Sequence, residues 1–180
     1  GPEEALQVGP DAANLQWALA GERERSGDID GAITIYEGLY ERLPNSPILA
    51  NNLASLISTY RDDDESLNRA YTIARRLRGL DVPAFQDTYG WIAQRRGNID
   101  EALAHLEPAS VGLPNDPLVQ YHYAVALASA GRTEEAIAQF RVALNVAGPA
   151  DTRQQFEIAK DEISRLETLL EAEAESESAN

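Results

Sequence analysis

The chain has 180 residues, of which 43% are hydrophobic and 25% are charged, a balance typical of a folded domain rather than of a disordered chain. Its formal net charge of −15 argues against nucleic acid and anionic lipid as partners, because clustered lysine and arginine bind both. Cysteine is absent, which excludes disulfides and thiolate chemistry, and no apolar run approaches the roughly 18–20 residues of a membrane-spanning helix.

The first residues resemble a cleavage scar followed by the end of a repeat. The chain begins with Gly-Pro and no methionine, which is typical of protease cleavage, so a native targeting segment before it could have been removed. Residues 5–10 (ALQVGP) are similar to residues 143–149 (ALNVAGP). We therefore predict that residues 1–12 hold the scar and the end of an upstream repeat, and that the chain is a fragment of a longer bacterial protein.

One short motif recurs along the chain. Residues 97–102 read GNIDEA, residues 131–136 read GRTEEA 34 positions later, and an earlier copy begins with GDID at residues 27–30. Around each copy, small residues stand where two helices would cross, which lets helices approach to about 8–10 Å. This period predicts a solenoid of helix pairs with units at 13–46, 83–116 and 117–150.

The second unit, at residues 47–82, departs from the pattern. Its turn between the two helices is expected to swell over residues 60–66, which include the acidic run 62–65. A calcium loop would need the glycine and the distant glutamate of an EF-hand, and both are missing. The acids are therefore predicted to cap the start of the second helix.

A last amphipathic helix is predicted at residues 151–172. Its apolar side chains fall at steps of three and four, and Asp151 with Gln154 resembles a capping box. Such a helix would cover the exposed core of the last repeat. Residues 173–180 are predicted to be a disordered acidic tail, with an acidic docking arm as the alternative. The apolar stripe comprises Phe156, Ala159, Ile163, Leu166 and Leu170.

The motif spacing and the small residues at the crossings resemble the tetratricopeptide repeat (TPR) superfamily over residues 13–150. The resemblance implies an all-α, right-handed superhelix of about four helix-turn-helix repeats plus the capping helix. The segments NNLA at 51–54 and DTYGW at 87–91 are also similar to terminal repeats of long bacterial TPR proteins of the envelope, some of which accompany exopolysaccharide export. Envelope, periplasm and cytoplasm all remain open as compartments.

The resemblance also implies an interaction scaffold whose first helices line a concave groove for a partner peptide or helix. Aromatic rings and amides suit this role, because rings give rigid contact area and amides bond a peptide backbone. The two tryptophans could instead pack between helices, and the two asparagines could cap or bridge helices. The groove positions are Trp17, Asn51, Asn52, Ser55, Asp87, Trp91, Arg95, Tyr121 and His122.

No pattern of catalytic residues is found. His105 and His122 fall on different helices without a motif that links them to carboxylates, and there is no phosphate-binding glycine loop and no nucleophile elbow. We therefore predict a non-enzymatic binding module without metal or cofactor. Two alternatives stay open: a self-assembling repeat module that stacks through its N-terminal end as a homo-oligomer, and the substrate-recruiting arm of a larger enzyme.

Overall fold

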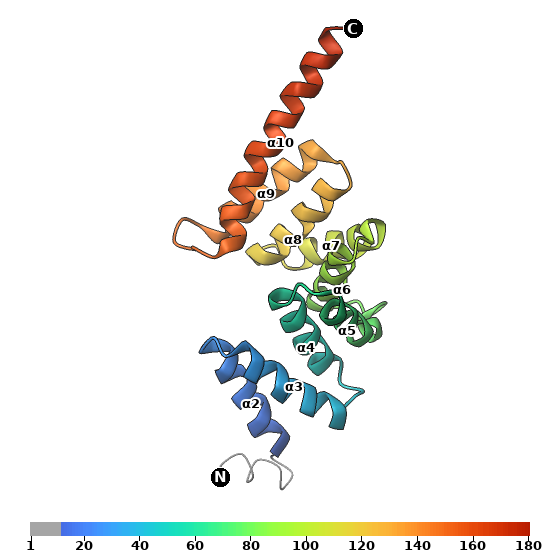
Figure 1. Cartoon of the computed structure of the whole chain (residues 1–180), viewed down its shortest axis with the longest axis vertical. Coiled ribbons are helices and arrows are strands. Elements are labelled where there is room, and N and C mark those ends of the chain that lie inside the picture. Colours follow the sequence, from blue (N-terminus) through green and yellow to red (C-terminus); the bar gives the residue numbers. More distant parts are fainter. Residues whose placement is uncertain (1–11) are drawn as a thin grey trace. The chain divides into compact units, whose positions relative to one another are not determined.

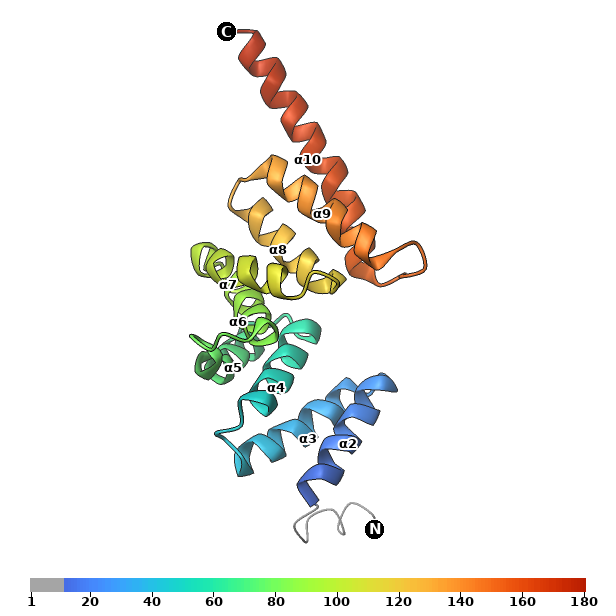
Figure 2. The ribbon, with the colours of Figure 1, turned by 180° about the vertical axis from the view of Figure 1, so that it is seen from behind.

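The computed structural model describes residues 12–180, and this part of the chain contains nine α-helices, one short 3-10 helix and no strand. Figures 1 and 2 show the helices from opposite sides. The prediction of an all-α helical-repeat fold is confirmed. The chain divides between Gly79 and Leu80 into two compact units, which are described separately. The predicted scar and upstream repeat at residues 1–12 lie almost wholly outside the described residues.

The first unit is a run of helices in which each packs against the next along the chain. Its core holds aliphatic side chains, alanines and two tyrosines, Tyr36 and Tyr40, and Leu49, Leu53 and Ile73 are fully buried. The elements are α2 (Ala12–Arg25), α3 (Ile29–Arg42), α4 (Pro47–Tyr60), α5 (Asp64–Ala74) and the 3-10 helix η1 (Arg75–Leu77).

The second unit holds two helix pairs and a long final helix. Helices α6 and α7 form one pair, α8 and α9 form the other, and α10 packs on α9 and α8. In Figure 1, α10 is the red helix that runs along the orange α9 and continues beyond it. The elements are α6 (Pro83–Arg95), α7 (Ile99–Gly112), α8 (Pro117–Ser129), α9 (Thr133–Ala147) and α10 (Gln154–Ser178).

The recurring motif marks the turn inside each of three helix pairs. Gly27, Gly97 and Gly131 all have positive φ, between 76° and 85°, which only glycine adopts without strain. The N–H of the residue after each glycine donates to the carbonyl five residues earlier, at 2.8–3.0 Å. This is the Schellman ending of a helix, so the motif recurs because the same helix ending recurs.

The acidic run of the degenerate unit caps a helix, as predicted. The carboxylate of Asp63 accepts a hydrogen bond from the backbone N–H of Ser66 at 2.9 Å, and this bond lowers the pKa of Asp63. The swollen turn is wrong in extent. Helix α4 continues to Tyr60 and α5 begins at Asp64, so only residues 61–63 separate them.

Helices α6 and α7 meet at a glycine. A Cβ atom placed on Gly90 would lie 2.7 Å from Cγ of Leu106 and 3.2 Å from Cβ of His105. Leu106 is fully buried, so it has little room to move. Beside this crossing, the Tyr89 hydroxyl donates to Glu101 Oε1 at 2.5 Å. Glycine at position 90 therefore sets how closely the pair packs.

Helix α10 covers the core of the last pair, which confirms the predicted cap. Phe156, Ala159 and Leu166 are buried in one cluster with Phe140 and Ala143 of α9. Ile163 and Leu170 are partly buried against the same cluster. One apolar stripe of α10 thus closes a surface that α8 and α9 leave open.

Two details of this helix correct the sequence predictions. Asp151 is not the N-cap: α10 begins at Gln154 after Arg153, and the Asp151 carboxylate binds the Arg153 guanidinium at 2.6 Å, which lowers the pKa of Asp151. The predicted disordered tail at 173–180 is helical as far as Ser178. Alanine and glutamate are strong helix formers, and a helix already nucleated on the core extends at little cost.

We expect Gly90→Ala to lower the melting temperature and Gly38→Ala to raise it. Overpacking against Leu106 costs about 1–3 kcal/mol, more than the gain in helix propensity. Gly38 also lies in a helix, but its added Cβ would meet no atom within 4 Å, so that variant gains about 0.5–1 kcal/mol. Thermal unfolding followed by circular dichroism compares the two. Equal shifts of the same sign would contradict the close packing at Gly90.

Ending the chain at Pro149 should expose the cluster around Phe140 and promote aggregation. Each large apolar side chain that α10 buries contributes about 1.5–3 kcal/mol, and Phe156 and Leu166 are each only 2% exposed. Light scattering coupled to gel filtration measures the outcome. A truncated protein that stays monomeric, with an unchanged melting temperature, would show that α10 is not required as a cap.

Candidate protein-binding surface

Five of the nine predicted groove residues come together on the second unit. Asp87, Trp91 and Arg95 follow each other at four-residue steps and so share one face of α6. Tyr121 and His122 lie on α8, which packs directly against α6. These five side chains are called the Trp91 cluster below.

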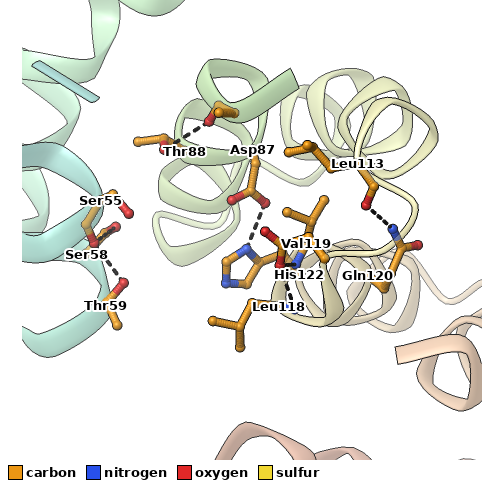
Figure 3. A network of polar contacts seen from close by, with 12 residues as sticks. Ser55, Ser58, Thr59, Asp87, Thr88, Leu113, Leu118, Val119, Gln120 and His122 are labelled. Carbon is orange, nitrogen blue, oxygen red and sulfur yellow. Dashed lines mark hydrogen bonds and ion pairs between the residues drawn. The ribbon is translucent and has the colours of Figure 1, made fainter. Parts of the chain in front are cut away.

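The centre of the Trp91 cluster is a stacked pair of rings held by a carboxylate. The rings of Trp91 and His122 are 4.1 Å apart and nearly parallel, with 18° between their planes. His122 Nδ1 and Asp87 Oδ1 lie 2.8 Å apart, and both side chains are less than a fifth exposed. Figure 3 shows Asp87 directed at the His122 ring. This bond fixes the plane of the imidazole and therefore the position of the indole that stacks on it.

Arg95 and Tyr121 complete the cluster from two sides. The Arg95 guanidinium carbon lies 5.9 Å from the centre of the Trp91 ring, within cation–π range. The Tyr121 ring is 6.2 Å from Trp91 and 6.0 Å from Phe140 of the core. Burial raises the pKa of Tyr121 and the Glu162 carboxylate raises it further. Tyr121 is buried, so it supports the cluster from the core side, whereas Trp91 is partly exposed.

A buried amide fixes helix α8, which carries two residues of the cluster. Nε2 of Gln120 donates to the carbonyls of Ser110 and Leu113 at the end of α7, both at 3.0 Å. Its Oε1 accepts a bond from Gln139 Nε2 of α9 at 2.6 Å. Figure 3 shows the bond to Leu113. Gln120 thereby uses both amide hydrogens and its oxygen, and it sets the start of α8 beside His122.

The other predicted groove residues belong to the first unit. Trp17 is partly buried and packs edge-on against Tyr36 at 6.1 Å. Burial and the charge of Glu24 raise the pKa of Tyr36, and a hydrogen bond with the Asn52 side chain opposes them. The buried Asn51 Oδ1 has no hydrogen-bond partner within the described part of the chain.

Ser55 lies on the same helix, α4. Its backbone carbonyl accepts bonds from the hydroxyls of Ser58 and Thr59, at 3.1 and 2.7 Å (Figure 3). These are local bonds of the helix, so they give Ser55 no link to the other predicted groove residues.

A pocket next to the Trp91 cluster was missed by the sequence analysis. It lies between α8, α9 and α10, has a volume of about 220 Å³ and shares Tyr121 with the cluster. The sequence signal that could have indicated it is Ile158 of α10, an apolar residue outside the core stripe that is exposed in the structure. The pocket is lined by Tyr121, Val125, Ala128, Ser129, Phe140, Ile158, Glu162 and Arg165.

The described residues offer no cluster for a metal and no span for a membrane. Among residues 12–180, no three histidine or acidic side chains gather in a way that could hold a metal ion. In the same part of the chain, no helix combines the length and the apolar character that crossing a bilayer requires. What the Trp91 cluster presents is a rigid, partly exposed aromatic surface with polar groups at its edges.

Comparison with known families decides what these helix pairs are. Residues 90–152, which include most of the Trp91 cluster, match the sequence model of the tetratricopeptide repeat. Residues 90–152 therefore belong to the tetratricopeptide repeat family. The predicted relation to the TPR superfamily is therefore confirmed, and TPR folds are in general non-catalytic modules for protein interaction. A search of curated proteins gives no match.

Solved structures of TPR proteins share this fold at low sequence identity. TTC0263, a thermophilic TPR protein from Thermus thermophilus, is 22% identical with a TM-score of 0.61, over 93% of this chain and 86% of that one. YrrB, described as a TPR protein with an unusual peptide-binding site, is 15% identical with a TM-score of 0.60, over 96% of both chains. MamA from Desulfovibrio magneticus RS-1 is 15% identical with a TM-score of 0.59, over 91% of this chain and 97% of that one.

We expect His122→Ala to release the Trp91 ring. Without the stacked imidazole, the indole gains solvent contact, so its fluorescence emission shifts to longer wavelength. The measurement is made in a Trp17→Phe background, which leaves Trp91 as the single tryptophan. His105→Ala is the matched control, because His105 packs on Tyr89 instead, at 4.6 Å. An unchanged emission in the His122 variant would contradict the stacked arrangement.

Proposed function

We propose that this TPR chain is a protein-interaction scaffold and that the Trp91 cluster is the anchor point for a partner peptide or helix. The observation that carries the proposal is the Trp91 ring itself. It remains partly exposed, yet His122 and Arg95 hold it in place. An aromatic side chain that is already ordered loses little entropy on binding, which is why such rings dominate binding energies at interfaces.

The polar groups around the ring suit a peptide better than a small charged ligand. His122 and Asp87 bind each other, so neither presents an unpaired charge to a ligand. The chain as a whole carries −15, which disfavours an acidic partner. We therefore propose an apolar or mildly basic partner segment. The general role of TPR folds in protein binding, and the peptide-binding site ascribed to YrrB, are consistent with this reading.

The first unit offers a separate polar contact point. The Asn51 side-chain oxygen is buried without a hydrogen-bond partner in the described chain, and an unsatisfied acceptor of this kind costs stability. We propose that the Asn51 side chain turns outward when a peptide binds to the first unit itself, and that its oxygen then accepts a backbone N–H of that peptide. Asn52, by contrast, bonds Tyr36, and Trp17 packs on the same ring, so both residues act in the first unit as supports.

Replacement of Trp91 by alanine tests the proposal. Removal of a central aromatic anchor costs about 2 kcal/mol or more of binding, close to thirtyfold in affinity. Trp91→Ala should therefore abolish the capture of partner proteins from a cell lysate while its helical content stays unchanged. Tyr60→Ala serves as the matched control, because Tyr60 is a half-exposed aromatic residue of the first unit that takes no part in the proposed contacts. A Trp91 variant that folds and captures the same partners would refute the anchor role, and one that loses its fold would show that Trp91 is a core residue.

A further inference from the structure

Helix α10 carries two apolar stripes, and capping explains only one of them. The core stripe includes Phe156, Ala159 and Leu166, which are buried against α9. Ile158 and Leu169 belong to a second stripe and remain 39% and 41% exposed. At 100° per residue, the two stripes are centred about 110° apart around the helix. The second stripe therefore lies on the side of the helix, beside the face that covers the core.

The second stripe continues the wall of the pocket. Ile158, Glu162 and Arg165 of α10 line it opposite the side chains of α8. Leu169 follows one turn later, so positions 158, 162, 165 and 169 are spaced by four, three and four residues. This is the spacing with which one helix packs along another. The face thus has the geometry of an unused helix–helix contact.

The size of the pocket limits what it can hold. Its volume of about 220 Å³ lies below the roughly 300–1,000 Å³ of sites for small molecules. One large apolar side chain fits this space, and the floor of Tyr121, Val125 and Phe140 is apolar. The occupant is therefore a side chain of a larger partner rather than a free metabolite.

The charges on α10 indicate which charge the partner carries. Glu162 and Arg165 bind each other at 2.8 Å along α10, on one wall of the pocket, so the pocket itself has little net charge. Beyond Arg165 the helix carries no basic residue and five glutamates, of which Glu167 pairs with Arg141 of α9. Charge complementarity across an interface favours partners of opposite sign and suppresses like-charged ones. A partner helix that follows α10 must therefore carry basic residues on its flanks.

We propose that the pocket between α8, α9 and α10 binds the apolar face of a basic amphipathic helix from a partner protein. One apolar side chain of that helix enters the pocket beside Ile158, and a second one, a few turns along, packs on Leu169. This inference rests on the proposed scaffold function and extends the binding surface from the Trp91 cluster onto α10. Helix α10 then has two tasks, because one stripe closes the core and the other recognises the partner.

The probe for this proposal is a labelled model peptide of about 18 residues, or five helical turns, with leucines spaced by three and four between lysines. Fluorescence anisotropy measures its binding to the full chain at about 0.15 M salt, where long-range charge effects are largely screened. Two companion peptides replace the lysines by glutamate or the leucines by serine. We expect both companions to bind at least about tenfold more weakly. The glutamate peptide lacks the charge complementarity, and the serine peptide lacks the apolar side chains that would fill the pocket.

A matched pair of double variants locates the binding. Ile158→Glu with Leu169→Glu should weaken the lysine–leucine peptide at least about tenfold. Val111→Glu with Val142→Glu changes the net charge equally at exposed valines of α7 and α9, and should leave affinity unchanged. Circular dichroism verifies that both variants fold. Equal affinities in the two variants would overturn the proposal, and so would equal binding of the serine peptide.

These results are separable from the test of the scaffold itself. If Trp91→Ala abolishes capture while the α10 variant binds the peptide as the wild type does, the Trp91 anchor stands and the α10 pocket is overturned. If both variants behave like the wild type, the scaffold function proposed for this unit is overturned as well.

Discussion

Each helix pair of this protein has an apolar surface that it cannot bury by itself, and the rest of the structure depends on this constraint. Phe140 and Ala143 of α9 are fully buried in a cluster that also holds Phe156 and Leu166 of α10. A repeat is therefore stable only with a neighbour or a cap. At the C-terminal end of the repeats, α10 provides this cap by burying the apolar surface of α8 and α9.

Close packing between the helices is what makes an exposed aromatic ring useful for binding. Gly90 lets α7 approach α6 until Leu106 fills the space where a side chain would stand. Gln120 links the start of α8 to the end of α7 and to α9. With both helices fixed, His122 can reach Asp87 and stack on Trp91. The fixed position of the Trp91 ring at the surface therefore depends on packing contacts in the interior.

Helix α10 keeps the residues that cap the core apart from those of the proposed partner site. Its buried and exposed apolar residues lie on different faces, so a change at Ile158 or Leu169 leaves Phe156 and Leu166 in the core. The acidic end adds no packing, since every residue after Leu170 is exposed. Glu175 and Glu177 stand in the last turn of α10, where the negative end of the helix dipole disfavours them. A basic partner, as proposed above, would account for their placement.

The sequence by itself determined the repeat, its turns and its cap. The same helix ending is predicted at Gly27, Gly97 and Gly131, because a positive φ is a requirement of the local backbone. The apolar stripe from Phe156 to Leu170 predicts a buried face, because helical periodicity is also a local property. The end of α10 was mispredicted because composition alone does not show that a helix nucleated on the core will extend. Only the tertiary structure decided which of nine candidate residues meet. Asp87 and His122 are 35 positions apart, and their contact depends on how closely α6 and α8 pack. The pocket at Ile158 likewise exists only once three helices are in place, since its walls are distant in sequence and each alone is an ordinary helix face.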